Sequence, residues 1–378
     1  MKMSFLLDGV MAVTWQQLIM YGVGICLIWL AVKKGYEPSL LLPLGFGAIL
    51  VNLPYSGVID QMVQGKVPAA GIIEWLFKTG IEASEAMPIL LFIGIGAMID
   101  FGPLLTNPKL MIFGAAAQFG IFFTLSLAAF FGFDLKDAAS VAIIGAADGP
   151  TSIFVANYFQ SSYIGPIIVA AYSYMALVPI VQPPVIKLLT TKKERLIRMP
   201  YEQKTVSKTT RILFPIIITI ITGIVSPRSV ALIGFLMFGN LLRECGVLNS
   251  LSETAQKVLA NLVTLFLGLT IATKMQAEAF LNLQTLMIIG LGLVAFIFDT
   301  AGGVLFAKIL NLFLKKKINP MIGAAGISAF PMSARVVHKM GLAEDPQNFL
   351  LMHSTGVNVS GQIASVIAGG LILNLIAR

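Results

Sequence analysis

The sequence predicts an all-α, polytopic membrane protein, folded as a bundle of spanning helices. Of its 378 residues, 57% are apolar and only 12% are charged, whereas roughly a quarter of the residues in soluble domains are charged. Its apolar runs approach the ~20 residues that a helix needs to cross a bilayer. Gly and Pro interrupt these runs, and the alternation typical of a membrane β-barrel is missing. A helical bundle is therefore the predicted fold class.

The apolar runs define the expected elements in chain order. We expect an interfacial amphipathic helix at Ala69–Thr79, and broken segments at Ala138–Phe159 and Asn319–Val337. The expected spans are Trp15–Val32, Ser39–Leu53, Pro88–Leu104, Leu110–Phe131, Ile164–Leu189, Ile212–Val225, Val230–Leu242, Val258–Thr273, Leu283–Phe306 and one within Phe349–Ile376. The chain then divides into an N-terminal part (1–87), a first repeat (88–191), a basic loop (192–211) and a second repeat (212–378).

The basic residues between the two repeats predict the orientation of the bundle. This loop carries Lys187, Lys192, Lys193, Arg195, Arg198, Lys204, Lys208 and Arg211 against Glu194 and Glu202. By the positive-inside rule it faces the cytoplasm, so the net charge of +8 reports orientation. No nucleic-acid motif accompanies it. Counting spans from this loop requires each broken segment to cross an even number of times, which predicts two re-entrant hairpins of short helices.

The two broken segments contain related sequences. Ile144-Gly-Ala-Ala recurs as Ile322-Gly-Ala-Ala at an offset of 322 − 144 = 178 residues, and Leu91-Phe-Ile-Gly94 resembles Leu265-Phe-Leu-Gly268 at nearly the same offset. The span count gives the matched helices opposite directions. Inverted repeats with discontinuous helices are a transporter architecture, with ion sites at the repeat interface. Short Gly-Ala matches also arise by chance in membrane sequences.

Asp148 is the strongest candidate for an ion site. It precedes Gly149-Pro150 inside an otherwise apolar segment. A carboxylate at membrane depth is costly unless it faces a partner, an ion or water, and a helix break frees backbone groups that are tolerated only where they line a cavity. One interpretation is a structural carboxylate bonded to nearby N–H or hydroxyl groups. The interpretation that we favour is a ligand for a hard cation such as Na⁺, or a proton carrier.

Other polar residues at membrane depth have both a structural and a functional interpretation. Ser328 can bond back to its own turn, Asn319 can cap a helix, and Arg335 can be a cation at the cytoplasmic rim or hold a carboxylate. Further candidates are Tyr174, Asn358 and Gln362, which can bond between helices, and the acids Asp100 and Asp299, which form a second tier. Cys26, Cys245, His338 and His353 form no metal or disulfide pattern, and no nucleotide-binding or catalytic-triad motif is found.

A set of ordered motifs covers nearly the whole chain from Trp15. Together these motifs closely resemble the β subunit of the sodium-pumping, biotin-dependent decarboxylases, which act on oxaloacetate, methylmalonyl-CoA or glutaconyl-CoA. The motifs are Asp100-Phe-Gly-Pro, Gln118-Phe-Gly-Ile-Phe-Phe, Gly145-Ala-Ala-Asp148-Gly-Pro-Thr, Tyr174 with Pro179-Ile-Val-Gln-Pro-Pro184, Asn319-Pro-Met-Ile-Gly323, Pro331-Met-Ser-Ala-Arg335 and Asn348-Phe-Leu-Leu-Met-His.

The resemblance implies a function and a set of site residues. It implies that carboxybiotin is decarboxylated at this membrane subunit, which exports Na⁺ and consumes a proton. It implies that Asp148, Tyr174, Asn319, Ser328 and Asn358 bind Na⁺, that Arg335, Ser328 and Gly323 handle carboxybiotin, and that Arg335, Asp148 and Tyr174 act in catalysis. The implied partners are a biotin carrier subunit, a carboxyltransferase α subunit and a small membrane anchor subunit, with a homo-oligomer in a bacterial inner membrane.

Two alternatives remain open from the sequence. The same hairpins and carboxylate would serve a Na⁺/H⁺ antiporter or a Na⁺-coupled carrier without decarboxylase activity. Within the decarboxylases, the chain is short for an oxaloacetate enzyme's β subunit, which favours the acyl-CoA decarboxylases. Because the sequence has no Ala-Met-Lys-Met biotinylation context, biotin is expected to arrive on another polypeptide.

Overall fold

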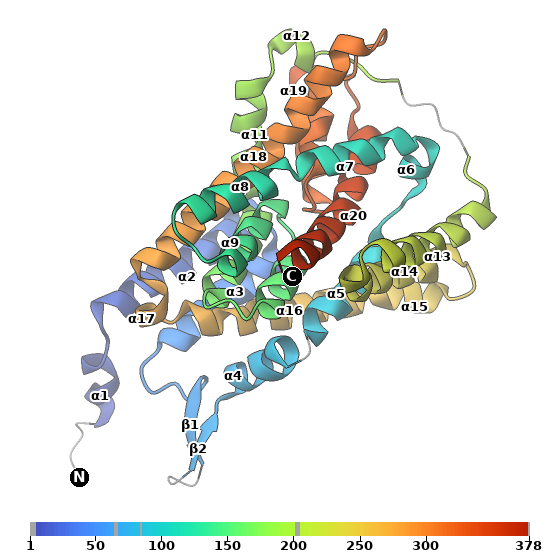
Figure 1. The fold of residues 1–378 in the computed structure, drawn as a ribbon. Helices are drawn as coiled ribbons and strands as arrows, with labels where there is room; N and C mark the ends of the chain where they lie inside the picture. Colours follow the sequence, from blue (N-terminus) through green and yellow to red (C-terminus); the bar gives the residue numbers. More distant parts are fainter. Residues whose placement is uncertain (1–4, 64–66, 84, 201–204, 377–378) are drawn as a thin grey trace.

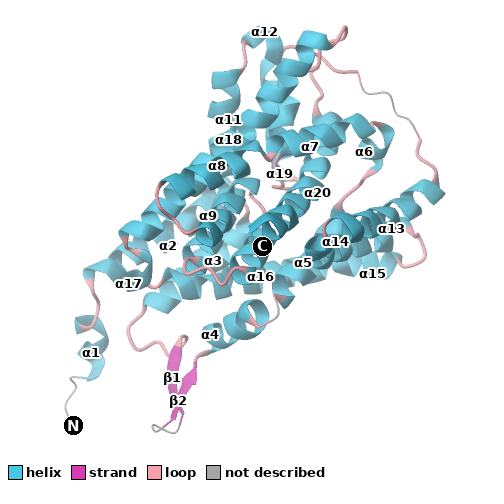
Figure 2. Cartoon of the chain, viewed as in Figure 1, coloured by secondary structure: helices cyan, strands magenta, loops and turns pink. Residues whose placement is uncertain are grey.

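Helices make up almost all of the computed structural model, which describes residues 5–63, 67–83, 85–200 and 205–376. Figure 2 shows this, with two strands projecting at one end of the bundle. The N-terminal region comprises α1 (Phe5–Met11), α2 (Trp15–Lys34), α3 (Pro38–Asn52), the antiparallel strands β1 (Asp60–Val63) and β2 (Val67–Ala70), α4 (Ile72–Phe77) and the π-helical turn η1 (Lys78–Glu82). The strands, in register Asp60↔Ala70, were not predicted.

The middle of the chain supplies the first broken segment. It contains α5 (Ala86–Met98), α6 (Gly102–Thr106), η2 (Pro108–Leu110), α7 (Met111–Ala117), α8 (Phe119–Phe130), α9 (Leu135–Ala142), η3 (Ile143–Ala146), α10 (Gly149–Tyr158) and the long helix α11 (Ile164–Leu189). The predicted span Leu110–Phe131 is interrupted at Gln118, between α7 and α8. There the Ile121 N–H bonds to the Gln118 carbonyl and to a side chain of another helix, Asp299.

The second part of the chain supplies the second broken segment. Its elements are α12 (Lys192–Arg195), α13 (Lys208–Val225), η4 (Pro227–Ser229), α14 (Val230–Glu244), α15 (Asn249–Glu253), η5 (Thr254–Leu259), α16 (Ala260–Ile271), η6 (Ala272–Met275), α17 (Ala277–Phe280), α18 (Leu283–Phe313), η7 (Pro320–Gly326), α19 (Met332–Glu344) and α20 (Leu351–Ile376). The predicted basic loop therefore includes α12 and the start of α13. Its residues Glu202 and Lys204 lie outside the described residues.

The expected multi-span architecture is confirmed. Among the described residues, seven helices are long and apolar enough to cross a membrane, or eight if the bent pair formed by Ile72–Glu82 and Ala86–Met98 is one span. The seven are Trp15–Lys34, Pro108–Phe130, Ile164–Leu189, Lys208–Val225, Asn249–Met275, Leu283–Phe313 and Leu351–Ile376. Two predicted spans are shorter helices of 15 residues each, α3 and α14.

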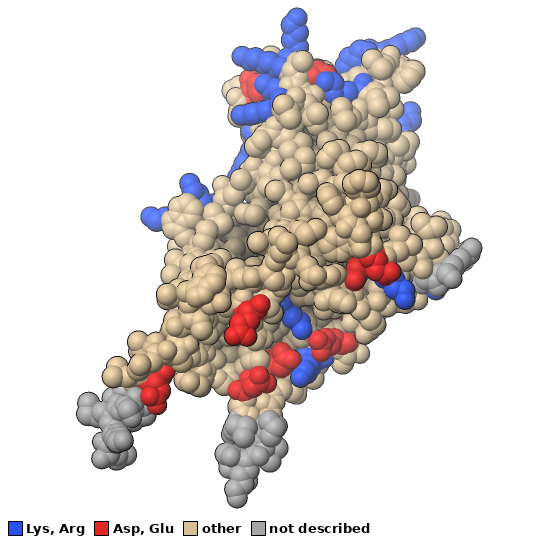
Figure 3. Space-filling model, turned by 60° about the vertical axis from the view of Figure 1, so that its left-hand side comes forward, with Lys and Arg blue, Asp and Glu red and all other residues tan. Residues whose placement is uncertain are grey.

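The two ends of the bundle differ in charge. Figure 3 shows most Lys and Arg gathered over the end where α12 lies, with a few acids among them, whereas most Asp and Glu on this face lie toward the opposite end together with a few basic residues. Basic loops face the cytoplasm in membrane proteins. The charge distribution therefore agrees with the orientation expected from the sequence.

Helix α18 supports both broken segments. Gly145 of η3 packs on it so closely that a Cβ atom would come within 2.8 Å of the Ala295 Cβ. Farther along the same helix, Gly303 and Gly323 of η7 meet backbone to backbone, leaving no room for a side chain on either. The long helix runs from the end near α17 to the end near α12 (Figure 1). The two breaks are thereby held at neighbouring positions along one rigid element.

Small residues also set the crossing of α5 and α14, and this crossing yields the first prediction. A Cβ atom on Gly239 would overlap the Ile93 carbonyl, and overpacking of this kind typically costs about 1–3 kcal/mol. We expect Gly239→Ala to lower the thermal unfolding midpoint of the purified protein. Gly290→Ala is the matched control, because Gly290 in α18 has nothing within 4 Å of a built Cβ. Equal midpoints for the two variants would contradict the tight crossing.

Candidate functional site

The first helix break lies at Ala147 and Asp148. Ala147 ends η3 in the left-handed conformation, with φ of 52°, which interrupts the helical hydrogen-bond ladder. Asp148 then becomes the N-cap of α10, and Pro150 occupies its first turn, where a missing N–H has no cost. The local sequence therefore turns the chain and points the carboxylate at the start of α10.

Asp148 is buried, with only 3% of its surface exposed. Its Oδ2 accepts hydrogen bonds from Thr151 Oγ1 at 2.7 Å, Ser365 Oγ at 3.1 Å and Gln362 Nε2 at 3.4 Å. Its Oδ1 accepts one bond within the described residues, from the Thr151 N–H at 3.4 Å. Within the described residues no ion pair involves this carboxylate. Neutral donors therefore surround it.

The second break meets the first through backbone and hydroxyl contacts. The Ser328 N–H, just beyond η7, donates to the Ala146 carbonyl at 2.9 Å. The Ser328 Oγ donates to the Gly361 carbonyl at 3.1 Å and contacts the Ser365 Oγ. Ser365 thus bridges Ser328 of one break to Asp148 of the other. The structure brings these two predicted site residues together.

Helix α20 supplies the polar face between the breaks. The Asn358 Nδ2 donates to the carbonyls of Ala325 and Ile327, at 3.1 and 2.7 Å, while its Oδ1 is buried without a partner. Asn358, Gln362 and Ser365 follow the spacing that places residues on one side of a helix. Oxygen atoms from a carboxylate, hydroxyls and an amide are the ligand types that a hard cation takes.

Side-chain hydrogen bonds hold both ends of the first broken segment and the start of the second. At the first, the Ser161 Oγ, just after α10, donates to Asp137 Oδ1 in the first turn of α9, at 2.6 Å. At the second, the Asn319 side chain donates to the carbonyls of Arg195 and Ile197, at 2.8 and 2.9 Å. Its Oδ1 accepts the Met321 N–H and caps η7. Asn319 therefore lies at the basic end of the bundle, bonded to the loop that contains α12.

The two tyrosines of α11, Tyr172 and Tyr174, make different contacts. Tyr174, the predicted ligand, donates its hydroxyl to the Ile289 carbonyl and stacks on Phe296, both in α18. Tyr172 was not predicted. Its buried ring fills the space that a Cβ on Gly149 would need, and its hydroxyl has no partner among the described residues. Of the two, Tyr172 is the one that contacts the residue next to Asp148.

Arg335 lines a cavity of about 280 Å³. The guanidinium is exposed, and the cavity is also lined by Lys34, Glu37 and Lys339. Glu37 caps α3 in a left-handed conformation, with φ of 35°. Burial raises the pKa of the Glu37 carboxyl, and the nearby Arg335 charge opposes this shift. Its charged lining residues are three cations and one carboxylate, so a cavity of this size can take an anionic group of a small ligand.

The second-tier acids have different surroundings. Asp100 accepts the Gly102 N–H at 2.8 Å and lies 3.6 Å from Arg211, partly exposed. Asp299 is fully buried in α18; its Oδ1 accepts the Ile121 N–H at 3.1 Å, and its Oδ2 has no partner. A Cβ on Gly145 would lie 2.7 Å from that Oδ2. Asp299 therefore contacts the break that carries Asp148, whereas Asp100 pairs with another helix.

Two residues that bond to Asp148, Thr151 and Ser365, were not predicted from the sequence. Thr151 follows Asp148 at the spacing of an N-cap bond, which is a usable signal. Ser365 lies three residues after Gln362 and seven after Asn358, so helical periodicity would have placed it on the same face. Hydroxyls are frequent in apolar helices, and only the fold shows which of them face the carboxylate.

A buried carboxylate between two helix breaks, in a bundle of spanning helices, defines an ion-transporting membrane protein. A family model described as Na⁺-transporting oxaloacetate decarboxylase beta subunit matches residues 16–376. The chain is 48% identical to the glutaconyl-CoA decarboxylase subunit beta of Acidaminococcus fermentans, over 98% of this chain and 96% of that protein. It is 46% identical to the methylmalonyl-CoA decarboxylase subunit beta of Propionigenium modestum, over 95% and 94%.

A third relative, the oxaloacetate decarboxylase beta chain of Haemophilus ducreyi, is 44% identical over 98% of this chain and 97% of that protein. The chain therefore belongs to the β-subunit family of the Na⁺-transporting decarboxylases, the membrane subunits of biotin-dependent decarboxylases. The resemblance noted from the sequence motifs is confirmed. A β subunit belongs to a complex of several subunits.

The contact between Asp299 and the first break yields a prediction about Na⁺. Asp299→Leu removes the acceptor of the Ile121 N–H beside Gly145, which we expect to shift the break and raise the Na⁺ concentration for half-maximal decarboxylation. Substitution of a residue that orients ion ligands typically lowers the affinity for the ion by about 10- to 100-fold. Asp299→Asn keeps an acceptor oxygen and should stay near wild type.

Thr300→Val is the control for the Asp299 variants, because Thr300 is equally buried one residue farther along α18 and its hydroxyl has no partner. Na⁺ titrations of the assembled complex compare the variants. The same Na⁺ dependence for Asp299→Leu and Thr300→Val would contradict the role given to Asp299.

Proposed function

We propose that this chain binds Na⁺ between its two helix breaks and carries it outward when carboxybiotin is decarboxylated at the cytoplasmic side. The observation that carries the proposal is the bridge from Asp148 through Ser365 to Ser328, which joins a carboxylate of one break to a hydroxyl of the other. Asp148, Ser328 and the free Oδ1 of Asn358 are the proposed ligands. A bound cation would therefore hold the two breaks together.

For Tyr174, Asn319 and Gly323, which the family resemblance also implicates, we propose supporting roles in place of direct contact with the ion. Tyr174 and Asn319 act by holding the surrounding elements, because their polar groups are already bonded to Ile289 and to the loop after α11. Gly323 acts by allowing η7 to pack against the backbone of Gly303. The hydroxyl that we add to the cation site is that of Tyr172, which lies beside Gly149.

The cavity at Arg335 is the proposed site for carboxybiotin. A guanidinium holds a carboxylate through paired hydrogen bonds, and Lys34 and Lys339 add positive charge around the same cavity. In the reaction the bond between the ureido nitrogen and the carboxylate carbon breaks. The electron pair stays on the nitrogen, which takes up one proton, and CO₂ leaves.

The coupling follows from competition between a proton and Na⁺ for Asp148. A proton that reaches Asp148 from the outer side removes its negative charge and releases Na⁺ in that direction, and this proton then supplies the biotin nitrogen. Moving one net positive charge outward against 100 mV costs about 2.3 kcal/mol before any concentration gradient, so every Na⁺ exported beyond the number of protons taken up needs a source of energy. Decarboxylation supplies that energy.

The proposed architecture behind this coupling is a pair of inverted repeats. The bond from Ser161 to Asp137 brings the ends of the first broken segment together, and this supports a re-entrant hairpin. In transporters of this type, repeats rock against each other around a site at mid-membrane. The repeats proposed are residues 88–191 and 212–378, with 1–87 and 192–211 as additional parts.

The assembly proposed follows the family. It includes a biotin carrier subunit, a carboxyltransferase α subunit and a small membrane anchor subunit, with several copies of this chain in a bacterial inner membrane. We favour an acyl-CoA decarboxylase, because alignment with the glutaconyl-CoA relative spans 369 positions, whereas alignment with the Haemophilus oxaloacetate relative spans 423. The longer alignment reflects segments that this chain lacks.

Decarboxylation of free carboxybiotin by the purified subunit, with and without Na⁺, tests the proposal directly. Faster CO₂ release with Na⁺ is the expected result. A secondary Na⁺/H⁺ antiporter would release no CO₂ from carboxybiotin and would instead exchange Na⁺ for protons in proteoliposomes without any carboxylated substrate.

Asp148→Asn tests the cation site. Loss of the charged ligand should raise the half-saturating Na⁺ concentration by at least about 100-fold, beyond the effect typical of residues that only orient ligands. Asp134→Asn is the matched control, because Asp134 is an exposed N-cap residue in the same segment. Na⁺-dependent CO₂ release measures both. Unchanged Na⁺ dependence in the Asp148→Asn subunit would rule out this carboxylate as a Na⁺ ligand.

Glu37→Gln tests the carboxybiotin cavity. Ionised Glu37 repels the substrate carboxylate, so its removal should lower the half-saturating carboxybiotin concentration severalfold. Because the pKa of Glu37 is raised, the wild-type cavity loses affinity as pH rises through that pKa, and the variant should lose less. Glu278→Gln, in α17 away from the cavity, is the control. An unchanged pH profile in Glu37→Gln would exclude Glu37 from the substrate cavity.

A further inference from the structure

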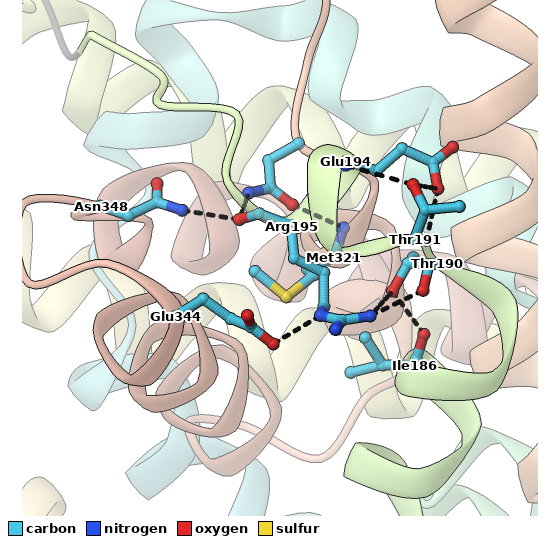
Figure 4. Close-up of polar contacts among 9 residues, drawn as sticks. Ile186, Thr190, Thr191, Glu194, Arg195, Met321, Glu344 and Asn348 are labelled. Carbon is cyan, nitrogen blue, oxygen red and sulfur yellow. Dashed lines mark hydrogen bonds and ion pairs between the residues drawn. The ribbon is translucent and has the colours of Figure 1, made fainter.

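Arg195 occupies the centre of a polar cluster at the basic end of the bundle. It is the last residue of α12, in the loop between α11 and α13. Figure 4 shows its side chain and its backbone pointing to different partners, which come from α11, from the start of η7, from the end of α19 and from the turn before α20. One residue therefore touches four segments that are far apart in the sequence.

The side chain of Arg195 binds the end of α19. Its Nε lies 2.6 Å from Glu344 Oε1, and its Nη1 donates to the Thr190 carbonyl at 2.6 Å. The ion pair is well shielded, with 14% of the Arg195 side chain and 17% of the Glu344 side chain exposed. A shielded, hydrogen-bonded ion pair is stronger and more directional than an exposed one. The pair fixes Arg195 between α11 and α19.

The backbone of Arg195 binds the start of the second break. Its carbonyl accepts the side-chain amides of Asn319 and Asn348, each at 2.8 Å. Asn319 in turn accepts the Met321 N–H and so caps the first turn of η7. The position of the Arg195 carbonyl, which the side-chain ion pair sets, therefore determines where Asn319 and η7 lie.

A continuous chain of bonds then leads to the cation site. It runs from Glu344 through Arg195 and Asn319 to η7. Immediately after η7, Ser328 bonds to the Ala146 carbonyl and to Ser365, which bonds to Asp148. Asn319, at the start of the second broken segment, and Glu344, at the end of α19, are therefore tied to the same arginine.

We propose that Arg195 is a positioning residue for Na⁺ coupling: by joining Asn319 and Glu344, it closes the second broken segment at its cytoplasmic end and holds Ser328 against the first. This inference rests on the proposed Na⁺ site at Asp148 and Ser328. It gives the basic loop a mechanical role besides setting orientation, and it explains why Asn319 acts at a distance from the carboxylate.

Arg198 offers a matched control in the same loop. It pairs with Asp345 at 2.6 Å and with Gln347 at 2.7 Å, next to the partners of Arg195. Its hydrogen bond lowers the pKa of Asp345. However, 56% of the Arg198 side chain is exposed, and none of its described bonds reaches Asn319. The same charge is therefore removed in either variant, but only the Arg195 variant removes the side-chain ion pair that anchors the backbone carbonyl to which Asn319 bonds.

The experiment compares Arg195→Gln, Glu344→Gln, their double variant and Arg198→Gln in the intact decarboxylase complex, reconstituted into liposomes. It measures CO₂ release against Na⁺ concentration and the Na⁺ transported per CO₂. We expect Arg195→Gln and Glu344→Gln to raise the half-saturating Na⁺ concentration by about 10- to 100-fold, as for other residues that orient ion ligands. Fewer Na⁺ ions should be transported per CO₂, and the double variant should resemble the single ones.

Arg195→Lys keeps the charge and one donor and should fall between wild type and Arg195→Gln, whereas Arg198→Gln should stay close to wild type. Equal Na⁺ dependence in Arg195→Gln and Arg198→Gln overturns the inference. A lower yield of Arg195→Gln complex whose assembled fraction has normal Na⁺ dependence also overturns it, because the residue then serves folding alone. If Asp148→Asn also leaves the Na⁺ dependence unchanged, the proposed location of the Na⁺ site is wrong.

Discussion

Backbone groups freed at a helix break must find hydrogen-bond partners inside the protein when the break lies at membrane depth. Both breaks of this chain are organised by that constraint. The Ser328 N–H bonds to the Ala146 carbonyl, so each break satisfies part of the other. The carbonyls of η7 accept amide donors from neighbouring helices, Ala324 from Gln182 in α11 and Ala325 from Asn358 in α20. The polar residues of the spanning helices are therefore placed where the broken backbone requires them.

A second constraint is the close packing that brings the breaks together. Small residues along α18 let η3 and η7 lie against its backbone, and Gly361 of α20 packs against Gly326 just as closely. The same closeness leaves Asp299 and Asn358 with buried oxygen atoms that have no donor nearby. Dense packing thus creates both the rigid frame and buried oxygens without hydrogen-bond partners, one of which, Asn358 Oδ1, is a ligand in the proposed cation site.

The sequence predicted the parts of this arrangement that depend on local composition. Apolar runs located the spans, and α11 begins and ends at the residues expected, Ile164–Leu189. Gly and Pro located both breaks, and an acid in an apolar run located Asp148. Sequence reasoning missed the strands at 60–70 and the break at Gln118. The break at Gln118 depends on a contact between distant segments, because the N–H at Ile121 is taken by Asp299, 178 residues away.

The same limit applies to the candidate site. Family motifs identified Ser328 and Asn358, which the structure places beside Asp148 or η7. They did not indicate that Asn319 lies with Arg195 at the basic end, or that the hydroxyl of Tyr174 is taken by Ile289. A motif identifies residues that occur together in a family. It does not show whether a given residue binds the ion or supports the surrounding helices. Ser365 shows the converse, since its role follows from its bonds and from no motif.

The hydrogen bonds of Asp148 also give a structural basis for the proposed exchange of Na⁺ for a proton at this carboxylate. An ionised carboxylate accepts only, and its Oδ2 already takes three donors, from Thr151, Ser365 and Gln362. A cation can approach Oδ1, which has one long bond, while those donors remain. A proton turns one carboxyl oxygen into a donor. If it settles on Oδ2, the hydroxyls of Thr151 and Ser365 must reorient; if it settles on Oδ1, it occupies the oxygen that the cation needs. Either position removes the negative charge that attracts Na⁺ in the proposed mechanism. The first also weakens the link from Ser365 to Ser328, which would couple proton binding to separation of the two breaks.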